Sequence, residues 1–165
     1  MVSEDPSLVN AREADGTAIL TAVYHRQKEI VNLLVARGAA LSLFEAAAAG
    51  EIERVERLIG ESPSDLNAFS PDGWTPLHAA LAANQKMAAG LLIGHGADLD
   101  APDGGGWRPL HLAAANNNLD SMRTLVAQGA DLSATNKDGL TPIAMAEQKN
   151  HKEAAAFLKR HGAVG

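Results

Sequence analysis

Histidine is the residue type in this chain that most readily suggests proton transfer or metal binding. Six histidines occur, and a neutral imidazole can exchange a proton near neutral pH or bind zinc. His78 and His111 occupy equivalent places in a recurring local sequence (111 − 78 = 33), and the other four do not share that place: His25, His95, His151 and His161. No His-Glu-x2-His or His-x3-His spacing is present. The histidines therefore predict no metal site.

Carboxylates, hydroxyls and glycines also fail to form a catalytic set. No nucleophile is paired with a base, no Gly-x-Ser-x-Gly sequence occurs, and no phosphate-binding lysine follows a glycine loop. The charged run at residues 51–57 alternates acidic and basic side chains, which is typical of a solvated helix face with weak ion pairs. The three glycines at 104–106 are best explained as a turn. We therefore expect no enzymatic activity and no cofactor.

Trp74 and Trp107 are the residues whose type most favours binding. Each directly follows a turn glycine, and the interval between them is the one that separates the two paired histidines (107 − 74 = 33). Tryptophan is enriched at interface hot spots because it buries a large area at small entropic cost. The alternative is that each ring packs over its own turn and stiffens it. The sequence leaves both interpretations open.

These residues belong to a repeat. Three strings recur at a constant interval (106 − 73 = 33 and 139 − 106 = 33): residues 73–78 (Gly-Trp-Thr-Pro-Leu-His), 106–111 (Gly-Trp-Arg-Pro-Leu-His) and 139–144 (Gly-Leu-Thr-Pro-Ile-Ala). Gly96, Gly129 and Gly162 keep the same step. A fixed period of this length indicates stacked modules, none of which buries its apolar face alone. Such an array offers an extended surface rather than a closed pocket.

One module shows how its helices begin and end. Residues 68–73 predict a turn, and Thr75 followed by Pro76 predicts a helix start over residues 76–83. Asn84 ends that helix, as Asn117, Asn150 and Gly50 do in other modules, because Asn and Gly readily adopt the left-handed conformation. A second helix is predicted over residues 86–94. Helices this short need neighbours to be stable.

The module resembles the ankyrin-repeat family in residues 72–80 (Asp-Gly-Trp-Thr-Pro-Leu-His-Ala-Ala), in Leu91 and Leu92, and in residues 96–98 (Gly-Ala-Asp). The resemblance implies an all-α solenoid of antiparallel helix pairs with projecting β-turn fingers. It gives His78 and His111 a structural role, in which each bonds to the neighbouring turn. It also implies that the side chains after the turn glycine face a protein partner.

We expect one domain over residues 1–165, with units at about 11–39, 42–64, 68–101, 102–134 and 135–163. The first two units are degenerate. The first has Ala18 and Leu20 in place of Pro and His, and Arg26 where Gly or Asn would end the helix. The second begins directly at Ser42, which forms a capping box with Glu45, so one finger is expected to be missing.

The two ends of the array also depart from the pattern. Residues 5–11 echo residues 62–68 without a preceding helix, which indicates either a start on an inter-repeat segment or an absent upstream module. Arg108 replaces the capping Thr of its module. The last module has Ala144 in place of His, and its second helix carries charged residues, as expected of a terminal cap: Lys152, Glu153, Lys159 and Arg160.

The sequence thus predicts a non-catalytic module that binds a protein partner through its concave face. The fingers would form the rim: Phe69, Pro71, Asp72, Trp74, Asp103, Trp107, Asn136, Lys137 and Leu140. The first helices would form the floor: Ala82, Ala83, Ala115, Asn116, Gln148 and Lys149. Small floor residues would leave a shallow trough, although alanine is also simply a strong helix former. The alternative is a structural or fragment unit of a longer array that stacks through its N-terminal end.

Composition narrows the class of partner. The net charge of −6 disfavours nucleic acid, which calls for a basic face. No apolar run is long enough to span a membrane, and the first residues do not form a secretory signal. The absence of cysteine excludes disulfides and thiolate metal sites. We expect a cytoplasmic monomer with a protein partner.

Overall fold

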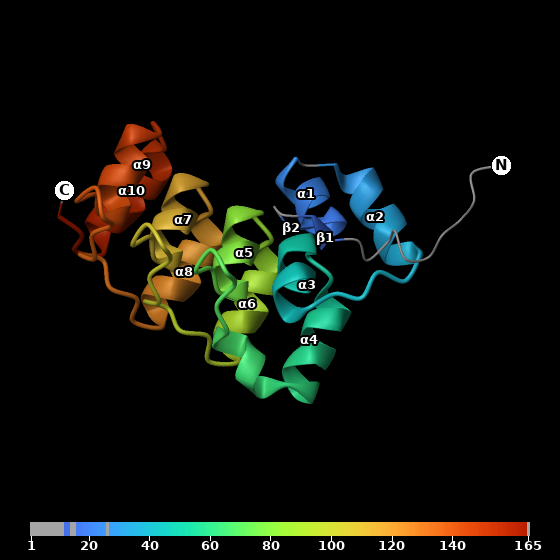
Figure 1. Cartoon of the computed structure of the whole chain (residues 1–165). Coiled ribbons are helices and arrows are strands. Elements are labelled where there is room, and N and C mark those ends of the chain that lie inside the picture. The colour runs from blue at the N-terminus through green and yellow to red at the C-terminus, as the bar shows by residue number, and fades with distance from the viewer. Residues whose placement is uncertain (1–11, 14–15, 26, 165) are drawn as a thin grey trace.

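Helices follow one another in pairs along the chain (Figure 1). The computed structural model describes residues 12–13, 16–25 and 27–164. The first helices of the pairs are α1 (Ala18–Tyr24), α3 (Leu43–Ala49), α5 (Pro76–Ala82), α7 (Pro109–Ala115) and α9 (Pro142–Gln148). The second helices are α2 (Lys28–Ala36), α4 (Ile52–Glu61), α6 (Lys86–Gly94), α8 (Leu119–Ala127) and α10 (Lys152–Arg160). We number these pairs unit 1 to unit 5.

The units stack in chain order. Each first helix contacts the next first helix from α1 to α9, and α4, α6, α8 and α10 contact one another in the same order. Figure 1 shows the colours running in sequence from the blue unit 1 to the red unit 5. Strands β1 (Arg12–Glu13) and β2 (Gly16–Thr17) form a short antiparallel hairpin before α1. The predicted all-α solenoid of helix pairs is confirmed.

Side-chain caps set where the first helices begin. Thr75 Oγ1 accepts a hydrogen bond from His78 N, Thr141 Oγ1 accepts one from Ala144 N, and a proline follows each threonine. Ser42 and Glu45 form the expected capping box, with Ser42 N donating to Glu45 Oε2 at 2.8 Å. Because α3 begins there directly from the preceding loop, unit 2 has no finger, as predicted.

Left-handed residues end the first helices in units 2 to 5. Asn84, Asn117 and Asn150 have φ angles of 57°, 52° and 59°, and Gly50 has a φ of 77°. A side chain at Gly50 would also collide with Gln85, whose Oε1 would lie 2.5 Å from the added Cβ. These four residues confirm the predicted turn between the two helices in units 2 to 5.

The core is built from leucine and alanine at repeating positions. Leu77, Leu110 and Ile143 point inward from the first helices and are at most 1% exposed. Fully buried alanines on the same helices, such as Ala80 and Ala113, allow neighbouring helices to approach closely. Unit 1 has a separate small cluster centred on three residues: Ile19, Ala22 and Val31. Unit 1 is therefore the most loosely attached unit, as its sequence suggests.

Two details differ from the expectations. The helix predicted over residues 76–83 ends at Ala82, with Ala83 as its cap. Residues Pro63–Asn67 form a 3-10 helix, η2, that the sequence analysis did not predict. The segment at residues 5–11 and Arg26 lie outside the described residues.

Asn84 provides a test of the left-handed turn. Asn84→Ala places a β-carbon in a conformation that ordinary residues avoid, so the free energy of unfolding should fall by about 1 kcal/mol. Asn84→Gly should stay within about 0.5 kcal/mol of the parent protein, because glycine adopts a positive φ freely. Urea unfolding followed by circular dichroism measures both. Equal stability of the two variants would contradict the proposed backbone requirement.

Candidate partner-binding surface

Three fingers project from the start of units 3, 4 and 5. Each is closed by one backbone hydrogen bond: Ser70 N to Trp74 O at 2.8 Å, Asp103 N to Trp107 O at 2.9 Å, and Asn136 N to Leu140 O at 3.0 Å. We name them finger 70–74, finger 103–107 and finger 136–140. They repeat the same geometry in successive units.

A polar side chain at the first position of each finger holds its turn. Ser70 Oγ accepts from Trp74 N at 3.1 Å. Asp103 Oδ1 accepts from Gly105 N and Trp107 N, both at 2.8 Å. Asn136 Oδ1 accepts from Asp138 N and Leu140 N, and this side chain is only 5% exposed. Asp103 and Asn136, predicted as rim contacts, are thus engaged in shaping their own fingers.

Neighbouring fingers pack backbone against backbone. Lys137 N donates to Gly105 O at 3.0 Å, and Lys137 Nζ donates to Gly104 O at 2.7 Å. A Cβ at Gly73 would lie 3.0 Å from Gly104 N, and one at Gly106 would lie 3.0 Å from Lys137 N. Glycine is required at these two positions because the next finger passes so close. The fingers therefore form one fixed row.

Buried histidines tie fingers 103–107 and 136–140 to the unit before each of them. Thr75 N donates to His78 Nδ1 at 3.2 Å, so Nδ1 is the acceptor and Nε2 carries the proton that is donated to Trp107 O at 3.0 Å. His111 repeats this pattern, with Nδ1 accepting from Arg108 N and Nε2 donating to Leu140 O at 2.9 Å. Both imidazoles are fully buried. The structural role implied for them by the family resemblance is confirmed.

Burial lowers the pKa of His78 and of His111 below the ordinary value, and the hydrogen bonds to Trp107 O and Leu140 O offset only part of this effect. The neutral imidazole is therefore the form that the folded protein favours. Protonation would place a charge in the core and disturb the Nδ1 acceptor. The positions of fingers 103–107 and 136–140 depend on these two residues staying neutral.

This pKa shift predicts acid sensitivity. The unfolded chain takes up protons near pH ~6.5, before the folded one does, so the free energy of unfolding should be constant above that value and fall as the pH drops below it. Urea unfolding between about pH 7.5 and pH 5.5 measures the effect. The loss in the free energy of unfolding between the two pH values should be smaller in His111→Gln than in the parent protein. The substitution His95→Gln, at an exposed position, should leave this loss unchanged. An unaltered difference in His111→Gln would contradict the assignment.

Glu45 occupies the position of these histidines in unit 2, since it precedes His78 by one repeat period (78 − 45 = 33). It is 4% exposed, and it accepts hydrogen bonds from the Ser42 backbone and hydroxyl and from Thr17 Oγ1 of unit 1. A carboxylate cannot donate to a carbonyl of the next finger, so Glu45 binds the preceding unit instead. The repeat spacing between Glu45 and His78 is a sequence signal for this buried, hydrogen-bonded role.

Finger 70–74 is the first finger of the continuous row, and a proline stands where the last finger has a residue that bonds to the finger before it. Pro71 occupies the position of Lys137, whose N–H bonds to the preceding finger. Proline has no N–H to donate, and unit 2 has no finger to receive it. The free edge of the row is therefore closed to backbone pairing in the way that proline protects sheet edges.

The two tryptophans are half-buried. The Trp107 ring packs against the core and stands edge-on to His111, with ring centroids 6.2 Å apart. It also lies over its own finger, since a Cβ at Gly105 would be 2.9 Å from its Cδ1. The Trp74 ring lies 6.4 Å from that of His78. Phe69, by contrast, is 59% exposed at the base of finger 70–74.

The predicted floor lies on neighbouring first helices. Ala82, Ala83 and Ala115 are half-exposed at the ends of α5 and α7. Asn116 is held by a bond from its Nδ2 to Leu81 O at 2.9 Å. Gln148 and Lys149 are exposed at the end of α9. Because α5, α7 and α9 pack side by side, the sequence-predicted floor residues do come together on adjoining units.

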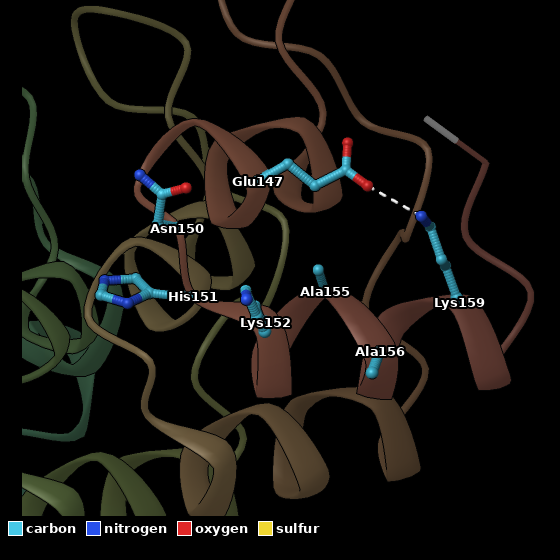
Figure 2. A pocket seen from close by; sticks show the side chains of 7 residues that line it. All are labelled: Glu147, Asn150, His151, Lys152, Ala155, Ala156 and Lys159. Atoms are coloured by element: carbon cyan, nitrogen blue, oxygen red, sulfur yellow. Dashed lines mark ion pairs between the residues drawn. The ribbon is translucent and has the colours of Figure 1, made fainter.

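One cleft lies between α9 and α10 (Figure 2), and two of its lining residues, Glu147 and Asn150, flank the floor residues 148–149 in the chain. Its volume is about 310 Å³ and it includes Ala155, Ala156 and Lys152. Lys159 Nζ lies 2.8 Å from Glu147 Oε1 across it. Nothing in its lining pairs a nucleophile with a base. Within the described ranges, no three histidine, cysteine or carboxylate side chains group to hold a metal ion.

Stacked helical hairpins with a row of projecting fingers define a helical repeat protein. The family model for ankyrin repeats (3 copies) matches residues 43–136, more than half of the chain. The chain therefore belongs to the ankyrin-repeat family. No curated protein matched the chain. Members of this family are generally protein–protein interaction modules without enzymatic activity. Among the described residues, no helix is long and apolar enough to cross a membrane.

Proposed function

We propose that this chain binds a protein partner, without catalysis, through the concave face made by the fingers and the first helices. The observation that supports this most is the fixed row of three fingers beside the small alanine side chains at the ends of α5 and α7. The row is rigid before any partner arrives, so binding costs little ordering entropy. A surface of this kind suits recognition rather than chemistry.

Phe69 is the anchor of this proposed site. It is the most exposed aromatic side chain on the fingers, at 59%, and it lies beside the exposed Pro71 and Asp72. Burying an aromatic ring at the centre of an interface is the usual source of a hot spot. Trp74, which is half-buried, contributes the part of its ring that the finger leaves open. Trp107 acts mainly by stiffening its own finger.

The floor and the outer finger residues give the partner its direction. Ala82, Ala83 and Ala115 carry no charge and project little, so a partner segment approaches the helix ends closely. Asp72 lies at the unit 3 end of the row, whereas Lys149 and Lys137 lie at the unit 5 end. Because the exposed Asp138 and Glu147 also lie at the unit 5 end, only Asp72 gives the partner a preferred charge, a basic group at the unit 3 end. Polar rim contacts of this kind set orientation more than affinity.

A second role, as a unit that stacks into a longer array through its N-terminal end, also has a specific observation in its favour. Ile30 and Leu33 on α2 are 43% and 49% exposed, although they are aliphatic residues within a helical array. This face is separate from the fingers, so the two roles do not exclude each other.

Phe69→Ala tests the concave site. Proteins captured from the source-cell extract by the immobilised chain are identified by mass spectrometry, and the dissociation constant of one of them is measured with purified protein. Phe69→Ala should raise this dissociation constant at least about tenfold, which corresponds to about 1.4 kcal/mol of binding free energy. Met87→Ala is the matched control, because Met87 is an apolar side chain on α6 that is 74% exposed.

Phe69→Ala should leave the thermal unfolding midpoint nearly unchanged, because the ring makes few internal contacts at 59% exposure. If Phe69→Ala binds like the parent protein while Met87→Ala loses affinity, the partner occupies the second helices and the concave site is wrong. Trp74→Ala is measured alongside, with its unfolding midpoint as a check on the finger.

A further inference from the structure

The two ends of the array carry complementary surfaces. The first is the N-terminal face of α2, which we define by Glu29, Ile30 and Leu33. The second is the C-terminal cleft between α9 and α10, which we define by Lys152, Ala155 and Ala156. We propose that the N-terminal face of one copy binds the C-terminal cleft of another, so that copies of this chain stack head to tail. This inference is independent of the concave site.

The position of each α2 residue within the repeat follows from α6. Both helices have nine residues, and a glycine with positive φ follows each at the same distance, Gly38 after α2 and Gly96 after α6. Residues of α2 and α6 therefore correspond with an offset of 58 (96 − 38 = 58). Ile30 stands at the position of Ala88, and Leu33 stands at the position of Leu91.

The position of Ile30 is buried in units 3, 4 and 5, each of which has a unit before it. Its counterparts on the second helices of these units are 0%, 3% and 0% exposed, respectively: Ala88, Ser121 and Ala154. Those second helices pack on the one before them. The counterparts of Leu33 are also covered. Leu91 packs against the core, Thr124 is half-buried, and Phe157 is 6% exposed. Ile30 and Leu33 thus stand at positions that contact the preceding unit elsewhere in the array. In unit 1 these two residues are 43% and 49% exposed.

The C-terminal cleft is the matching surface at the other end. Ala155 stands at the position of Ala89 and Met122, which are fully buried between units. Ala156 is exposed on the last unit, and with Ala155 it leaves the hollow of about 310 Å³ seen in Figure 2. Ile30 and Leu33 are larger than most of the residues at their positions in later units. Large side chains at one end would therefore meet, at the other, a hollow lined by two alanines and by five polar or charged side chains: Glu147, Asn150, His151, Lys152 and Lys159.

An ion pair inside the array sets the register of this contact. Lys86 Nζ lies 3.0 Å from Asp120 Oδ2, between the second helices of units 3 and 4. Lys152 occupies the position of Lys86 in unit 5, and Glu29 occupies the position of Asp120 in unit 1 (29 + 58 = 87 and 87 + 33 = 120). If unit 1 of a second copy packs on unit 5 as unit 4 packs on unit 3, Glu29 meets Lys152. The charges are opposite, as the internal pair requires.

Such a contact joins two different surfaces, so it does not close on itself as a two-fold dimer does. Each added copy presents a new free end, and the result is an open chain whose length grows with protein concentration. Sequence alone suggested a monomer. The exposed Ile30 and Leu33 favour association instead, because an apolar unit-to-unit surface in water is stabilised by being covered.

Sedimentation velocity of the full chain tests the proposal over concentrations from low micromolar to near-millimolar. The sedimentation coefficient of the parent protein should rise with concentration. Glu29→Lys and Lys152→Glu should each move the association at least about fivefold higher in concentration, because like charges then face each other. The double variant restores an opposite pair and should return close to the parent curve. Lys28→Glu is the matched control, since Lys28 occupies the position of Lys86, which faces the following unit.

Ile30→Ser combined with Leu33→Ser should abolish association while circular dichroism shows an unchanged helical signal. If that variant unfolds, the charge-swap series still decides the question, because its substitutions are on exposed helix positions. A parent protein that stays monomeric throughout would mean that something other than a second copy covers this face and would overturn the proposal. The proposal would also be overturned if Glu29→Lys and Lys152→Glu associated at the same concentrations as the parent protein. Phe69→Ala should associate like the parent, so failure here is distinct from failure of the concave site.

Discussion

The hydrogen bond from a buried imidazole to the carbonyl of the next finger joins helix starts, fingers and units into one structure. His78 receives the Thr75 N–H at Nδ1 and donates from Nε2 to Trp107 O, so one ring fixes a helix start and the following finger together. Helices of seven to ten residues are too short to be stable alone. Each unit is therefore stabilised by its neighbours, and the fingers keep their spacing because the histidines are neutral and buried.

Unit 2 shows what happens where this bond is replaced. Glu45 accepts hydrogen bonds from Ser42 and Thr17, which fixes the start of α3 against unit 1 without holding a following finger. The row of fingers is interrupted at this unit, and Pro71 closes the edge of the row that follows. Phe69 is left exposed beside that edge. The proposed anchor thus lies where the repeat is broken, at a position that is also exposed in units 4 and 5, where Pro102 and Thr135 occupy it.

Local signals made much of the fold predictable from the sequence. A capping threonine before proline, or an asparagine after a short helix, acts within a few residues, so the helix starts at Thr75 and Thr141 and the left-handed turn at Asn84 followed directly. The burial of Asn136, the packing of Trp107 against the core and the backward contact of Glu45 depend on the neighbouring unit. No local pattern encodes them. Repeat position does not encode them either, because Ser70 and Asp103, at the position of Asn136, are only half-buried, and the histidines at the position of Glu45 bond to the following finger.

The concave site and the stacking surfaces use different residues, so one can be occupied without blocking the other. Stacking of unit 1 on unit 5 would place the fingers of successive copies along one line, interrupted at unit 2 of each copy. A partner with several binding segments would then meet several concave sites held at fixed spacing. Its second contact would be intramolecular, and its overall affinity would rise without any new kind of contact. Association of the chain would in this way control how strongly it binds such a partner.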